Sequence, residues 1–180
     1  MKITKTILPG VVIIEPKVFG DQRGFFLEVF RDDSYTQLTG TGVRFVQDNH
    51  SQSRKGVLRG LHCQTNKPQG KLVRAIRGEV FDVAVDINPE SETFGKWASV
   101  YLSEHNKTQI YIPPGYAHGF QVVSEIADIE YKCTEYYDPS GESGLIWNDP
   151  DVAIEWPLKE AHLSPKDRLL PTLTQIESRK

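Results

Sequence analysis

Two histidines stand inside apolar, strand-like segments, where an imidazole is costly without a partner. His62 lies in the run Val-Leu-Arg-Gly-Leu-His-Cys-Gln, and His118 follows the run Pro-Pro-Gly-Tyr-Ala. Burying an imidazole costs free energy unless another group hydrogen-bonds to it. Two such placements therefore favour a functional site over two structural histidines. His105 and His162 fall in polar stretches and are expected to be solvated.

Charged side chains also occur in or beside predicted strands. Several cations that converge on one cavity would suit a phosphate-bearing ligand, because guanidinium groups bind phosphate oxygens in a bidentate manner. Solvated positions are the simpler expectation for Arg74 and Arg77. The charged residues in question are Arg23, Glu28, Arg59, Lys71, Arg74 and Arg77.

Strand alternation sorts some of these residues by face. Gln47 and Asn49 share one face, whereas Arg59 and His62 are three residues apart and would point in opposite directions in a regular strand. A bulge at Gly60 would bring both to the same side.

The Pro-Pro-Gly-x-x-His run resembles the second motif of the cupin superfamily, in which that histidine often binds a metal. A cupin metal site also needs two histidines one residue apart and a glutamate. The corresponding stretch here is His62-Cys63-Gln64, with a single imidazole. We therefore predict no metal.

The elements that must position these residues read as strands. The chain has 180 residues, 38% of them hydrophobic, enough to bury a core, with 14 glycines and 11 prolines for many turns. Short helices are predicted at Ser34–Leu38 and around Pro165–Asp167, and the polar residues after Pro171 are expected to fray. The predicted strands are Gly10–Glu15, Gly24–Phe30, Arg44–Asn49, Val57–Gln64, Lys71–Ile76, Gly78–Ile87, Lys96–Leu102, Gln109–Ile112, Gly119–Val123 and Asp128–Tyr136.

Many short strands with frequent turns predict an all-β fold, a sandwich or barrel with a few short helices. A jelly roll is the first choice and an immunoglobulin-like sandwich the second, although the Cys…Trp…Cys spacing of the latter is missing. We expect a single domain over residues 1–180.

The composition argues against nucleic acid and membranes as partners. The net charge of −3 gives no basic stripe for nucleic acid. The longest aliphatic run, Val11–Ile14, is far shorter than the roughly 20 residues of a membrane span, and the N-terminal residues lack a signal-peptide pattern. Cys63 and Cys133 have no CxxC spacing and are expected to be reduced, buried thiols. We expect a cytoplasmic protein.

Six motifs, in order along nearly the whole chain, resemble one family, the dTDP-4-dehydrorhamnose 3,5-epimerases. No one of them is specific alone, but the ordered set is. They are Gln47-Asp48-Asn49-His50-Ser51, Arg59-Gly60-Leu61-His62, Gly70-Lys71-Leu72-Val73-Arg74, the stretch from Gly78 to Asp86, the stretch from Pro114 to Phe120, and Leu163-Ser164-Pro165-Lys166-Asp167.

The resemblance implies a cupin-type jelly roll, a homodimer, and no metal or organic cofactor. It implies a substrate, dTDP-4-keto-6-deoxy-D-glucose, that is inverted at carbons 3 and 5. Both carbons flank a ketone, so each proton can leave to give an enolate and return on the other face. That chemistry needs a base, an acid and a donor to the enolate oxygen.

The family's roles carry over residue by residue. By resemblance, His62 is the base, Asp167 its carboxylate partner, Tyr131 the acid and Lys71 the group that stabilises the enolate. Arg59, His118 and Lys166 would contact the diphosphate and sugar, Gln47, Asn49 and Glu142 polar groups of the ligand, and Tyr137 the sugar or base. Arg23, Phe26 and Glu28 would reach over from the neighbouring subunit to hold the thymidine.

One residue departs from the family pattern. The family usually has an aromatic residue directly after the motif histidine, and here it is Cys63. Alternation predicts that Cys63 points away from the face that bears His62, which would change packing and leave catalysis intact. Its presence in the site would instead change substrate fit.

Three other functions are kept as alternatives. A mono-epimerase would invert only carbon 3 or only carbon 5, and the same motifs would serve it. A metal-dependent cupin oxygenase or isomerase is disfavoured by the missing His-x-His. A non-catalytic sugar-binding module would not need a base, a carboxylate partner and an acid together.

Overall fold

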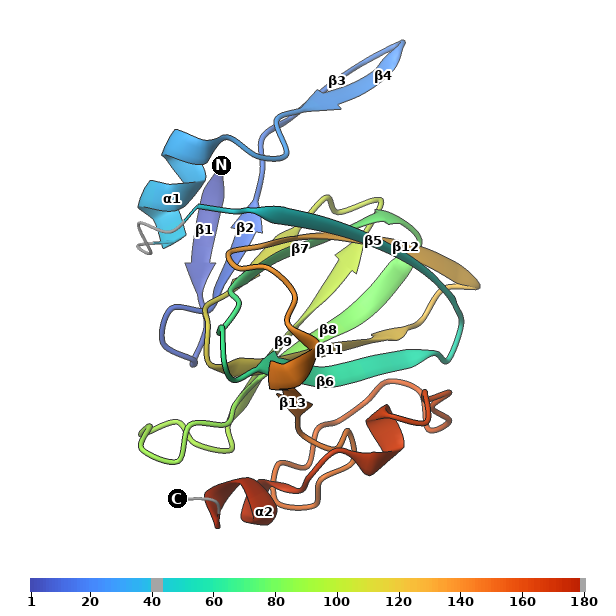
Figure 1. The fold of residues 1–180 in the computed structure, drawn as a ribbon. Helices are drawn as coiled ribbons and strands as arrows, with labels where there is room; N and C mark the ends of the chain where they lie inside the picture. The colour runs from blue at the N-terminus through green and yellow to red at the C-terminus, as the bar shows by residue number, and fades with distance from the viewer. Residues whose placement is uncertain (40–43, 179–180) are drawn as a thin grey trace.

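Two antiparallel β-sheets face each other, and a two-stranded hairpin projects from them (Figure 1). The computed structural model describes residues 1–39 and 44–178. The six-stranded sheet has the order β1-β2-β10-β7-β12-β5, and the five-stranded sheet the order β13-β6-β11-β8-β9. The predicted all-β jelly roll is confirmed.

The strands are β1 (Lys2–Lys5), β2 (Val12–Glu15), β3 (Val18–Asp21), β4 (Gly24–Leu27), β5 (Gln47–Arg54), β6 (Leu58–Gln64), β7 (Lys71–Arg77), β8 (Glu79–Asp86), β9 (Trp97–Ser103), β10 (Gln109–Ile112), β11 (Tyr116–Val122), β12 (Ile126–Cys133) and β13 (Glu142–Gly144).

The largest error in the predicted strands is at β5. The prediction placed a strand at Arg44–Asn49, but β5 runs from Gln47 to Arg54 and consists of polar residues. Its inward positions border a polar cavity instead of the apolar core, so no hydrophobic alternation marks it. β11 likewise begins at Tyr116, three residues before the predicted start, and β12 ends at Cys133, three residues before the predicted end.

The apolar core lies between the sheets and on their outer faces. Between the sheets, Val73 and Ile129 from the larger sheet pack with Val80 and Phe120 from the smaller one. The C-terminal segment covers the outer face of the smaller sheet, where Leu145, Val152 and Leu173 join residues of β6, β8 and β11. The two sheets are thereby held apart at a fixed spacing, which leaves room at one end for a cavity.

Short helices complete the fold. The predicted helix at Ser34–Leu38 is confirmed within α1 (Asp32–Thr39), and a 3-10 turn, η2 (Asp167–Leu169), follows Pro165; a second, η1, spans Pro139–Gly141. The expected fraying after Pro171 is wrong, because α2 (Leu173–Glu177) starts with a reciprocal Thr172–Gln175 cap and buries Leu173. No helix in the described part of the chain is long and apolar enough to cross a membrane.

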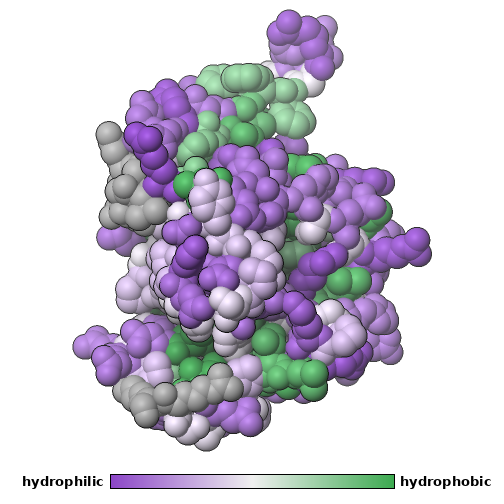
Figure 2. Space-filling model, viewed as in Figure 1, coloured by the Kyte–Doolittle hydropathy of each residue, from purple (hydrophilic) through white to green (hydrophobic). Residues whose placement is uncertain are grey.

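The β3–β4 hairpin stands clear of both sheets (Figure 1). Its aromatic side chains face solvent: Phe19, Phe25 and Phe26 are 52%, 58% and 70% exposed. Figure 2 shows a hydrophilic tip and a hydrophobic surface below it. Exposed aromatic side chains gathered on one element form the kind of apolar surface that is typical of interaction sites.

Candidate active site

A cavity of about 360 Å³ opens between the two sheets, and a recess of about 240 Å³ adjoins it. Both are lined by His62, Lys71, Tyr131 and Glu142. Sites of this size hold small ligands, and polar groups converge here from both sheets.

A bulge at Gly60 brings Arg59 and His62 to the same cavity. The pairing of β6 with β11 shifts register between His118 and Phe120, opposite Gly60. The φ of Gly60 is +115°, and a Cβ there would lie 2.6 Å from the carbonyl oxygen of His118. Only glycine accepts that conformation beside a neighbouring backbone. The predicted bulge is therefore confirmed.

His62 is paired with a carboxylate from the far end of the chain. Its Nε2 lies 2.7 Å from Oδ1 of Asp167, which is 3% exposed. Burial by itself raises the pKa of Asp167, but hydrogen bonds from His62, Ser164 and the backbone of Gly60 outweigh it and hold this pKa below 3.8. Asp167 is thus ionised at neutral pH and fixes the His62 ring, which leaves Nδ1 for a ligand.

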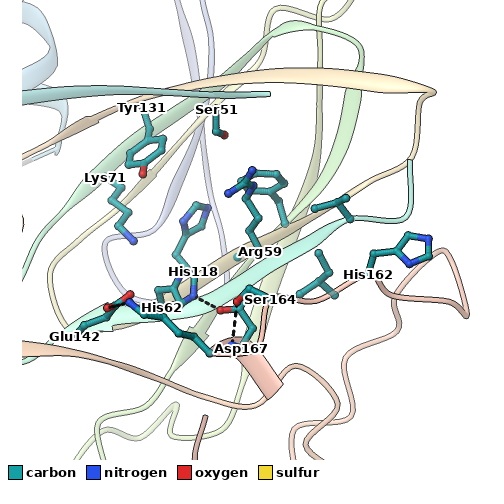
Figure 3. Close-up of a pocket in the computed structure, with 15 residues that line it drawn as sticks. Ser51, Arg59, His62, Lys71, His118, Tyr131, Glu142, His162, Ser164 and Asp167 are labelled. Carbon is teal, nitrogen blue, oxygen red and sulfur yellow. Dashed lines mark hydrogen bonds and ion pairs between the residues drawn. The ribbon is translucent and has the colours of Figure 1, made fainter. Parts of the chain in front are cut away.

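Tyr131 and Lys71 enter the cavity from the opposite sheet (Figure 3). Burial raises the pKa of Tyr131, and the nearby Cys133 adds to the effect, so the hydroxyl keeps its proton at neutral pH. Burial lowers the pKa of Lys71, although nearby Cys133 and other groups act in the opposite direction. The cavity thus has the His62 imidazole on one wall and the protonated Tyr131 phenol on the other.

Cationic groups line the part of the cavity beyond His62. The Nε of Arg59 donates to Oγ of Ser53 over 2.9 Å, which holds the guanidinium against the wall. Lys166 and His118 also line the cavity. These groups suit an anionic ligand.

Hydrogen-bonding side chains line the adjoining recess. Gln47 Nε2 donates to Oδ1 of Asn49 over 3.1 Å, which confirms that the two share a face. Glu142 accepts from Lys166 Nζ at 2.6 Å and from the Tyr137 hydroxyl at 3.1 Å. The recess therefore presents amide, carboxylate and aromatic groups together.

Other predicted site residues lie elsewhere in this chain. Arg23 and Phe26 are on the projecting hairpin and Glu28 follows it, so none of the three lines the cavity. Arg77 is exposed, as expected for a solvated position, whereas the Arg74 side chain is 27% exposed and paired with Glu130; neither residue lines the cavity or the recess.

Cys63 corrects the alternation argument. It lines the recess together with its neighbours His62 and Gln64, although alternation predicted that it points away. Alternation places neighbouring side chains on opposite faces of a strand. The recess lies at the end of β6, where side chains from both faces border it. Burial raises the pKa of the Cys63 thiol, and the positive charge of the nearby Lys71 offsets only part of this increase.

Several lining residues were not singled out from the sequence. His162, expected only to be solvated, is exposed but lies at the cavity edge, where its carbonyl accepts from Leu58 N at 3.1 Å. Ser164 stands in one of the quoted motifs, and that motif was the available signal. Ser51, Gly119 and Phe120 likewise stand in quoted motifs. The lining residues missed without such a signal are Val57, Leu58, Gln64 and Gln69.

Within residues 1–39 and 44–178, no group of three or more histidine, cysteine or carboxylate side chains is placed to hold a metal ion. The sequence-based expectation of a metal-free site stays a prediction.

A cupin-type jelly roll with an imidazole and a phenol on opposite walls of one cavity suits a class of protein, an epimerase that removes a proton from one face of a carbon and returns one to the other.

Comparison with known proteins agrees. The family model described as dTDP-4-dehydrorhamnose 3,5-epimerase matches residues 5–175. The enzyme of that name from Salmonella typhimurium is 55% identical over 177 residues, 97% of each chain. The chain therefore belongs to the dTDP-4-dehydrorhamnose 3,5-epimerase family, and it is an isomerase.

Solved structures give the same result. A dTDP-6-deoxy-D-glucose-3,5-epimerase from Legionella pneumophila, in complex with dTDP-4-keto-L-rhamnose, is 52% identical with a TM-score of 0.95, over 99% of this chain and 95% of that one. A 3'-monoepimerase from Streptomyces bikiniensis, in complex with dTDP-quinovose, is 32% identical with a TM-score of 0.90, over 97% and 89%.

Proposed function

We propose that this chain inverts carbons 3 and 5 of dTDP-4-keto-6-deoxy-D-glucose to give dTDP-4-keto-L-rhamnose, for dTDP-L-rhamnose synthesis. Family membership supports the reaction. The observation that carries it is geometric: His62 and Tyr131 project from opposite sheets into one cavity, with Lys71 beside Tyr131 (Figure 3).

His62 is the base of the proposed mechanism. Its Nε2 is held by Asp167, so Nδ1 takes the proton from the carbon next to the ketone. The electron pair moves from that C–H bond to the ketone oxygen and gives an enolate. Asp167 stabilises the imidazolium that forms.

Lys71 and Tyr131 complete each inversion. The Lys71 ammonium stabilises the negative charge on the enolate oxygen. Tyr131 then donates its proton to the carbon from the opposite face, and the ketone reforms. The phenolate regains a proton from solvent and His62 releases one, so the enzyme returns to its starting state. No electrons pass to another molecule, so the proposed mechanism needs no redox cofactor, and Lys71 supplies the positive charge at the enolate oxygen.

The remaining cavity groups hold the substrate. Arg59, His118 and Lys166 are assigned to the diphosphate and sugar, because they are the cations and the imidazole nearest His62. Tyr137 packs against the sugar or the base. Gln47, Asn49 and Glu142 bind polar groups of the ligand from the recess.

We further propose that the hairpin completes the site of a second subunit in a homodimer. Arg23, Phe26 and Glu28 are remote from their own cavity, and Phe26 is 70% exposed. Inserted next to a neighbour's recess, these residues would hold the thymidine through a cation, an aromatic ring and a carboxylate.

Mixing two inactive variants tests the shared site. His62→Ala and Arg23→Ala chains are denatured together and refolded. In a mixed dimer with exchanged hairpins, one site has both an intact His62 and an intact Arg23, so activity returns. If Arg23 serves its own chain, no site in the mixture is intact and activity stays at the level of the separate variants.

We assign residues 1–180 to one domain that works in the cytoplasm. The family model spans residues 5–175 without interruption, which supports a single unit. Limited proteolysis tests it: a single domain resists cleavage between its sheets until the whole chain unfolds.

Incubation with dTDP-4-keto-6-deoxyglucose in deuterium oxide tests the reaction. Proton NMR and mass spectrometry are expected to place deuterium at carbons 3 and 5, and His62→Ala should abolish both exchanges. Label at one carbon would identify a mono-epimerase instead. No label above a protein-free control, with substrate still bound, would leave only a binding module.

A further inference from the structure

A buried carboxylate lies below the cavity and has no role in the mechanism above. Asp82 on β8 is 0% exposed. It points between the sheets, like Val80 and Ala84, which flank it at alternate positions and belong to the inter-sheet core. A carboxylate in such surroundings is costly unless hydrogen bonds and charges compensate it.

The compensating hydrogen bond comes from a cavity residue. Both carboxylate oxygens of Asp82 lie within 3.0 Å of Nε2 of His118 on the neighbouring strand. The two residues are diagonal neighbours, since His118 is opposite Ala84 and Phe120 is opposite Asp82. With Nε2 donating to the carboxylate, Nδ1 is the ring nitrogen left for a ligand.

The same carboxylate acts on Lys71 from across the barrel. Lys71 is on β7 of the opposite sheet, and both Lys71 and His118 line the cavity (Figure 3). Burial lowers the pKa of Lys71, and the charge of Asp82 is one of the influences that raise it again. One buried carboxylate thus serves two cavity groups that come from different sheets.

A second aspartate on β8 shows the contrasting, local role. Asp86 is 3% exposed, and its carboxylate accepts from the hydroxyls of Ser91 and Thr93 and from the backbone of Asn88, all in the following loop. These hydrogen bonds hold the following loop in place, so they account for the burial of Asp86. The partner of Asp82 is instead a group that lines the cavity.

We propose that Asp82 is a positioning residue of the active site: it fixes the ring of His118 with Nε2 protonated, so that Nδ1 is the nitrogen left for a ligand. The assignment rests on the proposed epimerase function. It adds a buried carboxylate to the proposed base, carboxylate partner, acid and lysine, and it acts through His118 without touching substrate.

Asp82→Asn tests the pairing with His118 because it keeps the shape and removes the charge. We expect kcat to fall about 10–100-fold, the usual cost of losing such a supporting partner. We also expect the alkaline limb of the kcat–pH profile to move to lower pH, since Lys71 loses a nearby negative charge. The titratable groups that surround Lys71 in the wild type are Cys63, Cys133, Tyr131, His62, His118, Glu142 and Asp82.

Asp128→Asn is the matched control, because it removes a buried aspartate from a histidine pair outside the cavity. Its kcat and alkaline limb should match the wild type. An unchanged kcat for Asp82→Asn would mean a merely structural role and would overturn the proposal.

A measurement on the wild type covers the case in which Asp82→Asn fails to fold. Nitrogen-15 NMR of labelled histidines should show His118 protonated at Nε2 at neutral pH, whereas an unprotonated Nε2 would overturn the proposal. This readout needs no substrate. If the wild-type enzyme exchanges no deuterium, the proposed epimerase function is wrong. The NMR spectrum still decides whether Asp82 fixes the ring of His118.

Discussion

Two histidine–aspartate pairs of similar geometry occupy very different surroundings in this molecule. His62 and Asp167 are 2.7 Å apart in the cavity wall, and His50 and Asp128 are 3.1 Å apart on the outer face of the six-stranded sheet. In both pairs the aspartate is nearly buried. Only His62 faces a proton donor, Tyr131, across a cavity. The histidine–aspartate contact alone therefore does not distinguish the proposed base from a pair on the outer face; the group that lies across the cavity does.

The largest expected effect separates the two histidines. His62→Asn should lower the rate of deuterium incorporation about 10²–10⁴-fold, because the base is lost for both carbons. His50→Asn should leave the rate within about twofold, since its ring is outside the cavity. Rates measured by NMR under identical conditions decide the matter. Equal losses in the two variants would remove the distinction between the pairs.

Tyr131→Phe is expected to have the next largest effect and to divide exchange from inversion. The base still removes and returns protons on its own face, so some deuterium enters with retained configuration. Inversion should fall about 10²-fold, at the lower end for a positioned acid. Tyr101→Phe, at a 45% exposed tyrosine outside the cavity, is the control. Unchanged inversion in Tyr131→Phe would assign the acid to another group.

Substitution of the two aspartates should give a smaller contrast in rate than substitution of the two histidines. Asp167→Asn is expected to reduce kcat about 10–100-fold, because His62 keeps its place but loses the group that fixes its tautomer. Asp128→Asn should not change kcat. Steady-state assays on both variants measure the contrast, and a loss in Asp128→Asn equal to that in Asp167→Asn would contradict it.

The contribution of Asp128 to the stability of the folded protein should disappear at acidic pH. Hydrogen bonds from Gln52 and His50 lower the pKa of Asp128 in the folded protein below 3.8. A lowered folded-state pKa gives stability that is present above the unfolded value and is lost as pH falls through the folded one. Asp128→Asn should therefore lower the denaturation midpoint at pH 7, with the difference disappearing in acid. A midpoint difference that persists in acid would reject this origin.

The smallest effect at neutral pH concerns Lys71. Burial lowers its pKa from 10.5, so rising pH removes the ammonium earlier than in a free lysine. Activity should then decline on the alkaline side, about tenfold for each pH unit beyond that limb. Lys71→Arg keeps the charge through this range, so its remaining activity should lack the limb, whereas Lys132→Arg on the outer face should retain it. The kcat–pH profiles give the answer.

Much of the cavity could be predicted from sequence because its residues sit at fixed positions in strands. His62 and Lys71 stood out as polar side chains within strand-like segments, whereas the site role of Tyr131 and the roles of all three came from the family resemblance; the bulge at Gly60 was expected from a spacing problem alone. Asp82 was missed because its strand reads as a continuous buried run, in which one acidic residue gives no indication of its partner.

The missed strands lack a periodic signal for physical reasons. β3 is exposed at every position, so neither face carries a hydrophobic pattern, and the three-residue β13 is too short to show one. The position of Cys63 was wrong because alternation describes a flat strand and cannot describe a recess at its end. Local pattern predicts the elements, whereas the shape of the cavity depends on how two sheets meet.

The His62–Asp167 pair also has a consequence for how the chain folds. Its members are separated by 105 residues, and the C-terminal turn that bears Asp167 contacts β6 in the folded protein. Contacts between such distant residues form slowly, because long loops must close first. Strand signal in refolding should therefore return before turnover does, and recovered activity marks the docking of the C-terminal turn as the closing event of assembly.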